Sequence, residues 1–204
     1  MKIKMKILLC AFDPFGGESI NPALEAVKAA KIDGIELVKA EIPTVFYKSV
    51  EKANAIIDEI KPDAIIMIGQ AGGRAQITPE RVAINISDAS IDDNEGNRPC
   101  DEPIEAGAPA AYFSSLPIKD IVDRLKAENI PTAISNSAGT FVCNHLMYGV
   151  LRHIDKKGLQ AVAGFIHIPY LPQQIENKQN MPFLPLETSV KAVEIAVKTV
   201  AGLI

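Results

Sequence analysis

Cys143 stands in the first turn of an expected helix, directly after a stretch of small and polar residues. Residues 135–149 read SNSAGTFVCNHLMYG, and the apolar run that begins at Phe141 has Cys143 as its third member. Backbone N–H groups and the helix dipole stabilise negative charge at a helix N-terminus, so a thiol there can ionise and act as a nucleophile. Cysteine is also among the most frequently buried residues, and packing in the core is the competing interpretation. A catalytic thiol additionally needs a base.

Three histidines are available to act as that base. His145 is two residues from Cys143, so the two side chains would point about 200° apart on a helix. His153 lies at the far end of the same helix, where a cation complements the helix dipole. His167 lies toward the end of the apolar strand in GFIHIPY, just before Ile168 and Pro169, and would project toward the loops at the carboxyl edge of a sheet. The pattern therefore favours His167 as the partner of Cys143, with a hydrogen-bonded core histidine as the alternative.

A third group should orient the imidazole, and four acidic residues lie near the ends of expected strands. They are Asp13, Glu80, Asp88 and Asp92. Glu80 directly precedes a strand, but the nearby Arg74 and Arg81 make a plain ion pair the simpler interpretation. The residue pattern alone does not choose among the four.

Other chemistries receive little support from the motifs. The glycine-rich segments FGG and AGGR match neither G-x-G-x-x-G nor G-x-x-x-x-G-K-[ST], so phosphate binding is only weakly indicated. The pair Cys143-x-His145 has no second pair of metal ligands at a recognisable spacing. The acidic residues of 88–98 do not fit the positions of an EF-hand, and we interpret this run as a solvated loop. The sequence therefore predicts neither a metal nor an organic cofactor.

Composition limits the size of the fold and the class of partner. The chain has 204 residues, of which 48% are hydrophobic and 23% charged, and we expect residues 1–204 to form a single domain. A net charge of −4, the lack of a basic run and the absence of Trp argue against a nucleic-acid partner. Three cysteines are an odd number for a disulfide framework and fit a reducing compartment.

The apolar run near the amino end does not have the features of a signal peptide. Residues 7–12 are about half as long as the hydrophobic region of such a peptide and continue into DPFGG without a cleavage site. No segment of the sequence approaches the roughly 20 apolar residues of a membrane span. We therefore expect a cytoplasmic protein that does not bind membranes.

Strand-like and helix-like segments alternate along the chain. The expected strands cover 6–12, 36–43, 64–69, 81–87, 131–136 and 164–170. The expected helices cover 21–30, 45–60, 118–129, about 141–156 and 187–202. A long loop covers 88–109, and a Pro-rich excursion over 171–186 is expected to protrude as an arm. The alternation predicts an α/β fold of the α/β/α layered type, with a largely parallel twisted sheet.

In such sheets, ligand sites gather where strands end and helices begin. Four loops meet that description, namely 12–17, 69–74, 137–143 and 167–170. Cys143 and His167 belong to two of these loops, so any chemistry should take place at this edge.

Six segments along the chain together resemble one known family. In order, the chain contains FDPFGGESINP, IPTVFYKS, IGQAGGRAQITPERVAIN, DDNEGN, SAGTFVCNHLMYG and GFIHIPYLP. These segments are similar to those of pyroglutamyl peptidase I, also called pyrrolidone carboxyl peptidase. The resemblance runs from about residue 6 to residue 172 and continues more loosely to the end.

The resemblance implies a cytosolic cysteine exopeptidase that removes an N-terminal pyroglutamyl residue from peptides through a thioester. It also implies a Cys–His–Glu triad. The matching segments are TFVCNH for the nucleophile Cys143, FIHIPY for the base His167 and TPERVA for the acidic partner Glu80. The first two residues agree with the choice made from the residue pattern, whereas Glu80 rests on the resemblance alone.

The resemblance also implies where the lactam ring of the substrate binds. A small neutral lactam requires a pocket with apolar walls and a few fixed polar groups. The backbone of Gln70 would pair with the lactam amide. The implied walls are Phe12, Phe15, Thr44, Ile91, Phe141 and Val142.

One position departs from the family, and one segment bears on assembly. Ser90 stands where the family has an arginine just before the residue that matches Ile91, and Arg74 or Arg98 are the candidates to replace it. Members of the family are often homo-oligomers, so we expect a dimer or tetramer. The excursion 171–186, with the apolar residues Met181, Phe183 and Leu184, offers an arm for the subunit contact.

Two other functions fit the same scaffold. A non-catalytic binding protein would use the four loops to hold a small ligand, but it would have no need of Cys143, His167 and Glu80 together. A nucleoside phosphorylase-like enzyme would depend on phosphate and would have no essential thiol.

Overall fold

A five-stranded sheet forms the centre of the computed structural model, which describes residues 4–204. The strand order is β2-β1-β3-β7-β4. These strands are β1 (Lys6–Phe12), β2 (Glu36–Ile42), β3 (Ala64–Gln70), β4 (Thr78–Pro79) and β7 (Val162–Ile168). The first four in the sheet order run parallel, and only β4 pairs antiparallel, at the edge beside β7. The expected α/β fold with a largely parallel sheet is confirmed.

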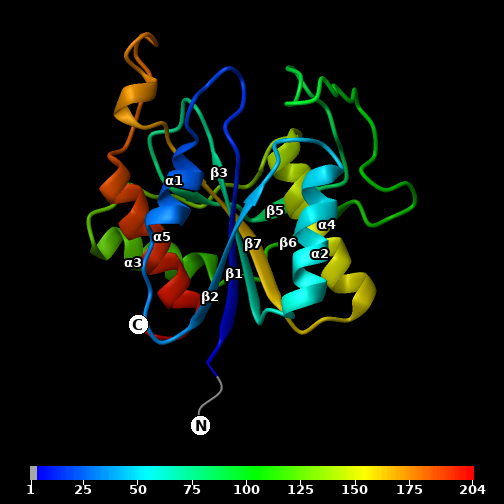
Figure 1. Cartoon of the computed structure of the whole chain (residues 1–204), viewed down its shortest axis with the longest axis horizontal. Helices are drawn as coiled ribbons and strands as arrows, with labels where there is room; N and C mark the ends of the chain where they lie inside the picture. Colours follow the sequence, from blue (N-terminus) through cyan, green and yellow to red (C-terminus); the bar gives the residue numbers. More distant parts are fainter. Residues whose placement is uncertain (1–3) are drawn as a thin grey trace.

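Helices cover both faces of this sheet (Figure 1). On one face lie α1 (Pro22–Ala29), α3 (Ile118–Ala127) and α5 (Leu186–Val200). On the other face lie α2 (Lys48–Ile60) and α4 (Val142–Lys157). No helix within residues 4–204 is both long enough and apolar enough to cross a membrane.

The central strands read as continuous apolar runs because both of their faces are buried. In β1, Ile7 and Leu9 pack toward α1 and α5, whereas Leu8 and Cys10 pack toward α2 and α4. The strand β3 is buried along its whole length. The sheet therefore separates two apolar cores, and each strand contributes alternate side chains to each of them.

Two expected strands differ from the structure. Within 81–87 only β5 (Val82–Ile84) is a strand, and it pairs with β6 (Ala111–Phe113) in a separate two-stranded sheet. Segment 131–136 forms no strand and makes only isolated bridges, Ile77 to Thr132 and Glu80 to Ser135. Its partner segment is short and contains Pro79, which has no N–H for a continuous ladder.

The Pro-rich excursion contains a short 3₁₀ turn, η1 (Pro172–Gln174). It extends beyond the start of α5, in orange in Figure 1. Met181 and Phe183 are exposed, whereas Leu184 is buried against the core under α5. The expectation that all three apolar residues are available to a subunit is therefore wrong for Leu184, because its backbone N–H also binds Tyr170 O at 2.9 Å and holds it inward.

Candidate active site

Cys143 is the second residue of α4, in the first turn as expected, and it is half-buried. Its Sγ lies over Gly69 of β3: a Cβ placed on Gly69 would stand 3.2 Å from that sulfur. Gly69 is paired in register with His167 of β7. Because alternate residues of a strand share a face, His167 lies on the same side as Phe165, which packs in the core beneath α4. The thiol and the imidazole thus lie on the same face of the sheet, beside neighbouring strands.

His167 binds a buried carboxylate. Its Nδ1 lies 2.7 Å from Glu80 Oε1, and both side chains are almost completely enclosed. Glu80 directly follows β4, and its N–H donates to Phe165 O at 2.8 Å. The short antiparallel strand therefore delivers Glu80 to the edge of β7, which leaves Nε2 as the ring nitrogen of His167 that Glu80 does not occupy.

The other three acidic candidates make different contacts. Asp13 Oδ1 accepts from the backbone and side chain of Thr44, both at 2.7 Å. Asp88 accepts from the N–H of Asp101 at 3.3 Å. Asp92 lies 3.9 Å from Arg98. Of the four residues that the sequence left open, only Glu80 contacts His167.

Glu80 also forms the ion pair that its neighbours suggested, but with only one arginine. Arg74 Nη1 lies 2.6 Å from Glu80 Oε1. Arg81 instead donates to Asn136 Oδ1 at 2.7 Å. Glu80 Oε1 therefore binds Arg74 and His167 together, so the ion pair and the histidine contact are both present.

Burial sets the resting protonation of the two reacting groups. Burial, assisted by the charge of Glu80, raises the pKa of the Cys143 thiol to about 12. Burial also lowers the pKa of His167, against the opposing effect of Glu80. Burial acts to raise the pKa of the Glu80 carboxyl, but hydrogen bonds from His167, Ser135 and Arg74, together with the charge of His167, lower it overall. At neutral pH the geometry therefore holds a neutral thiol beside a neutral imidazole and an ionised carboxylate.

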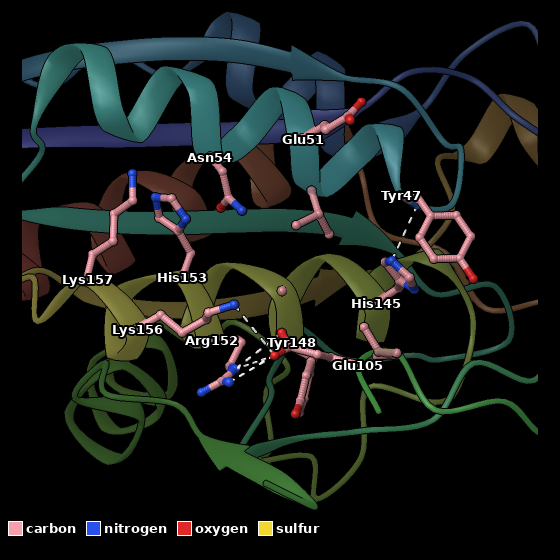
Figure 2. Close-up of a pocket in the computed structure, with 13 residues that line it drawn as sticks. Tyr47, Glu51, Asn54, Glu105, His145, Tyr148, Arg152, His153, Lys156 and Lys157 are labelled. Atoms are coloured by element: carbon pink, nitrogen blue, oxygen red, sulfur yellow. Dashed lines mark hydrogen bonds and ion pairs between the residues drawn. The ribbon is translucent and has the colours of Figure 1, made fainter. Parts of the chain in front are cut away.

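The remaining histidines serve the scaffold. His145 Nδ1 lies 2.9 Å from Ser87 Oγ, and Nε2 accepts from the N–H of Tyr47 at 3.3 Å. Both ring nitrogens are thus engaged away from Cys143, and Figure 2 shows His145 directed toward Tyr47. Burial lowers the pKa of His145 to about 4. His153 binds Asp58 at 3.0 Å, near the end of α4.

Most residues of the implied lactam pocket lie at the carboxyl edge of the sheet. Phe12, Thr44 and Val142 are buried. Phe141 packs edge-to-face on Phe46 with ring centroids 5.3 Å apart, and its ring lies 6.3 Å from that of Phe15. Ile91 is 47% exposed on its loop.

Gln70 has a side-chain partner that the sequence did not reveal. Its Oε1 accepts from Gln174 Nε2 at 2.9 Å, and both side chains are buried. Gln174 belongs to the Pro-rich excursion, so this segment folds back onto the strand end beside Cys143. Gln70 and Gln174 are separated by 104 residues in the sequence, so no local pattern could indicate the contact.

The loop 88–98 is not simply solvated, because hydrogen bonds to Asp93 hold it in place. Asp93 is buried and accepts from the N–H groups of Phe46, Glu95 and Asn97. These contacts help to lower the pKa of Asp93 against the effect of its burial. The interpretation of this run as solvated is therefore wrong at Asp93, whose carboxylate is buried by bonds within its own loop and by the N–H of Phe46 on a different loop.

Arg98 and Arg74 differ in what they contact near Ser90. Arg98 Nη2 donates to Ser90 O at 2.5 Å and so braces its own loop. Arg74 instead faces Glu80. Of the two candidates to replace the missing arginine, only Arg98 touches the position in question.

A cavity of about 550 Å³ lies elsewhere, between α2 and α4 (Figure 2). Two of its basic residues bind one carboxylate of the lining: Arg152 lies 2.9 Å from Glu105, and Lys156 lies 3.6 Å from the same group. Cys143, His167 and Glu80 do not line it. The reactive groups are thus separate from this cavity.

The comparisons with known proteins agree with the geometry. The family model described as pyroglutamyl peptidase matches residues 5–202. A pyrrolidone-carboxylate peptidase of Thermoanaerobacter pseudethanolicus is 58% identical over 97% of this chain and 98% of its own length. Pyrrolidone-carboxylate peptidase 2 of Caldanaerobacter subterraneus is 59% identical over 96% of each chain.

Solved structures extend the likeness to the whole fold. The crystal structure of Bacillus amyloliquefaciens pyroglutamyl peptidase I superposes with a TM-score of 0.93, at 51% identity over 98% of both chains. A variant of Pyrococcus furiosus pyrrolidone carboxyl peptidase also gives a TM-score of 0.93, at 44% identity over 98% of this chain and 99% of that chain. The chain therefore belongs to the pyroglutamyl peptidase family of peptidases.

Proposed function

We propose that this protein is a cysteine exopeptidase that removes N-terminal pyroglutamate from peptides, with Cys143, His167 and Glu80 as its catalytic residues. The bond of 2.7 Å between His167 and Glu80, on the face of the sheet where Cys143 lies, is the observation that carries the assignment of roles. Membership in the family supports the reaction and its substrate class.

Acylation begins with a proton transfer from Cys143 to His167. Glu80 accepts a hydrogen bond from Nδ1–H of His167, so Nε2 carries the lone pair that takes the thiol proton. The thiolate then attacks the carbonyl carbon of the pyroglutamyl residue. As the C–N bond breaks, the imidazolium of His167 gives its proton to the leaving amine, and a thioester remains on Cys143.

Deacylation uses the same groups in the reverse order. Neutral His167 removes a proton from water, and the resulting hydroxide attacks the thioester carbonyl. The C–S bond breaks, the proton returns to Cys143 and free pyroglutamate leaves. Throughout, Glu80 keeps Nδ1 protonated and stabilises the imidazolium in both half-reactions.

The start of α4 supplies donors for the oxyanion of each tetrahedral intermediate. The N-cap residue Phe141 makes no side-chain hydrogen bond to the first turn. The N–H of Cys143 therefore belongs to a first turn without side-chain capping, where the helix dipole also favours negative charge. We assign the oxyanion contact to this N–H.

Specificity for the lactam follows from an apolar pocket with few polar groups. We assign the pocket walls to Phe12, Phe15, Thr44, Ile91, Phe141 and Val142, and pairing of the lactam amide to the backbone of Gln70. A prolyl substrate has the same ring size but no lactam carbonyl. It would leave a pocket donor unpaired, which selects against it by a large factor.

Assembly and location are part of the same proposal. We place the enzyme in the cytoplasm, as a single catalytic domain that forms a homo-oligomer. The exposed Met181 and Phe183 of the Pro-rich excursion supply an apolar contact for a second copy. Sedimentation of a monomer at micromolar concentration would remove the oligomer from the proposal.

The experiment is hydrolysis of a pyroglutamyl-coumarin amide, with a prolyl-coumarin amide as the control substrate. Wild type should release coumarin from the first substrate only, and Cys143→Ser should abolish the release. Cys100→Ser is the matched control, because Cys100 is an exposed cysteine outside the site and its replacement should leave the rate unchanged. No release by freshly reduced wild type would refute the peptidase assignment.

A further inference from the structure

One oxygen atom of Glu80 accepts hydrogen bonds from two side chains. Glu80 Oε1 lies 2.6 Å from Arg74 Nη1 and 2.7 Å from His167 Nδ1. The Glu80 side chain is fully buried, whereas that of Arg74 is one-third exposed. The guanidinium thus closes the solvent side of a buried carboxylate that already faces the imidazole.

Arg74 is itself fixed by two further acceptors. Its Nη1 donates to Thr78 Oγ1 at 2.7 Å, and its Nη2 donates to Ser137 O at 3.3 Å. Thr78 belongs to β4, and Ser137 lies in the segment that leads into α4. The planar fork of the guanidinium therefore ties the strand that delivers Glu80 to the segment that delivers Cys143.

The positive charge of Arg74 allows Glu80 to stay ionised without a proton on His167. Two charged groups act on His167, namely Glu80 from the end of β4 and Arg74 from the loop after β3, and the Cys143 thiol of α4 lies on the same face of the sheet. A guanidinium is charged at every pH at which the protein is folded, so it neutralises the buried carboxylate without a proton on His167. If Arg74 were absent, the buried carboxylate would have to recruit a proton, either on the imidazole or on itself.

We propose that Arg74 is a positioning residue of the reaction, which keeps Glu80 ionised and directed at His167 so that the imidazole remains free to take the thiol proton of Cys143. This inference rests on the proposed function, because it assigns Arg74 a role through Glu80 and His167. Arg74 acts through these residues and needs no contact with the substrate.

The consequence is a change in pH dependence. Without Arg74, the pKa of His167 rises if the proton settles on the imidazole, and the pKa of Glu80 rises if it settles on the carboxyl. In both cases the reactive form, with neutral imidazole and ionised carboxylate, is reached only at higher pH. The acid limb of the kcat/KM profile therefore moves upward whichever group takes the proton.

The test compares Arg74→Gln, Arg74→Lys and wild type across the pH range with the pyroglutamyl-coumarin amide. Arg74→Gln should move the acid limb up by about one pH unit and lower kcat/KM about tenfold at pH 6, with KM little changed. Arg74→Lys keeps the charge but not the fork, so its limb should move in the same direction by less. If Arg74→Gln does not fold, the shift in Arg74→Lys remains the deciding measurement.

Arg81→Gln is the matched control, because Arg81 is a nearby arginine whose side chain binds Asn136 rather than Glu80. Its acid limb should coincide with that of wild type. An acid limb that stays in place in both Arg74 variants, or that moves equally in Arg81→Gln, would overturn the proposal.

A titration of the His167 ring by NMR, assigned with His167→Gln, separates this inference from the proposed function. The signals of the His167 ring report the titration of the imidazole and of the neighbouring Glu80 carboxyl. A raised pKa for either group in Arg74→Gln supports the role of Arg74 even if no substrate is cleaved. An unchanged ring titration refutes it even in an active peptidase.

Discussion

Cys143 Sγ lies 3.2 Å from the point where a Cβ on Gly69 would stand, so the sulfur and the Phe165 ring share the space that this glycine leaves open. Gly69 does not have the positive φ that favours glycine. Glycine is therefore needed at residue 69 for space: the strand passes beneath the nucleophile at the position paired with His167. A side chain at residue 69 would separate the two reacting groups from the sheet that aligns them.

Gly69→Ala should therefore lower both activity and stability. Its methyl group would lie 2.5 Å from the Phe165 ring as well as close to Cys143 Sγ. We expect a loss of about 1–3 kcal/mol in the free energy of unfolding from overpacking, and a fall of about tenfold or more in kcat/KM from displacement of the thiol.

Gly164→Ala is the control for this prediction. A Cβ on Gly164 would clash with Ser114 and Leu116, away from the thiol. Urea denaturation and hydrolysis rates of both variants separate the two effects. If Gly164→Ala loses as much activity as Gly69→Ala for an equal loss of stability, the contact with Cys143 has no special role.

The residue pattern favoured Cys143 and His167, which the structure places on one face of the sheet, but it could not select Glu80. The first two lie at the ends of long, strongly patterned elements, α4 and β7, whose positions follow from periodicity. Glu80 depends on β4, a strand of two residues that pairs antiparallel with β7. So short a segment has no recognisable period, and only the resemblance to a family indicated it.

The loops that surround the site were the least predictable part of the chain. Asp93 lies in a segment rich in Asp, Asn and Gly, a composition typical of solvated loops, yet it is buried against the N–H of Phe46. Gln174 contacts Gln70 across 104 residues. Such contacts depend on how loops from different strands meet at one edge, which local composition does not encode.

Asp13→Ala should weaken substrate binding more than it slows the chemical step. Asp13 Oδ1 accepts from Thr44 and also from Asn94 Nδ2 at 3.2 Å, so one carboxylate joins three loops that carry assigned pocket residues. We expect KM to rise about tenfold with a smaller change in kcat. Asp92→Ala, which removes an exposed carboxylate 3.9 Å from Arg98, should leave both constants unchanged. Equal effects of the two substitutions on KM would contradict the role of Asp13.

Gln174→Ala should loosen the Pro-rich excursion and the end of β3 together. The Gln174 side chain accepts from the N–H of Leu171 at 2.9 Å and donates to Gln70. Its removal leaves buried polar groups unpaired, at a cost of about 1–3 kcal/mol. We expect faster amide hydrogen exchange over 171–178 and a raised KM. Gln173 is an exposed neighbour and provides the control, because Gln173→Ala should change neither the exchange nor KM. Unchanged exchange in Gln174→Ala would argue against a structural role for the Gln174 side-chain amide.

His145 should make folding stability depend on pH. Burial lowers the pKa of His145 from 6.5 to about 4 in the folded protein, so below pH 6.5 the unfolded chain binds a proton that the folded chain does not. The stability that neutral His145 contributes is complete above that pH and is lost as the pH falls toward 4. A shift of this size corresponds to about 3 kcal/mol. Urea denaturation at pH 7.5 and 4.5 should therefore show a loss of about 2–3 kcal/mol in wild type beyond that in His145→Gln, whose amide does not titrate. Equal losses in the two proteins would mean that another buried group controls the acid response, since all other titrating residues are common to both.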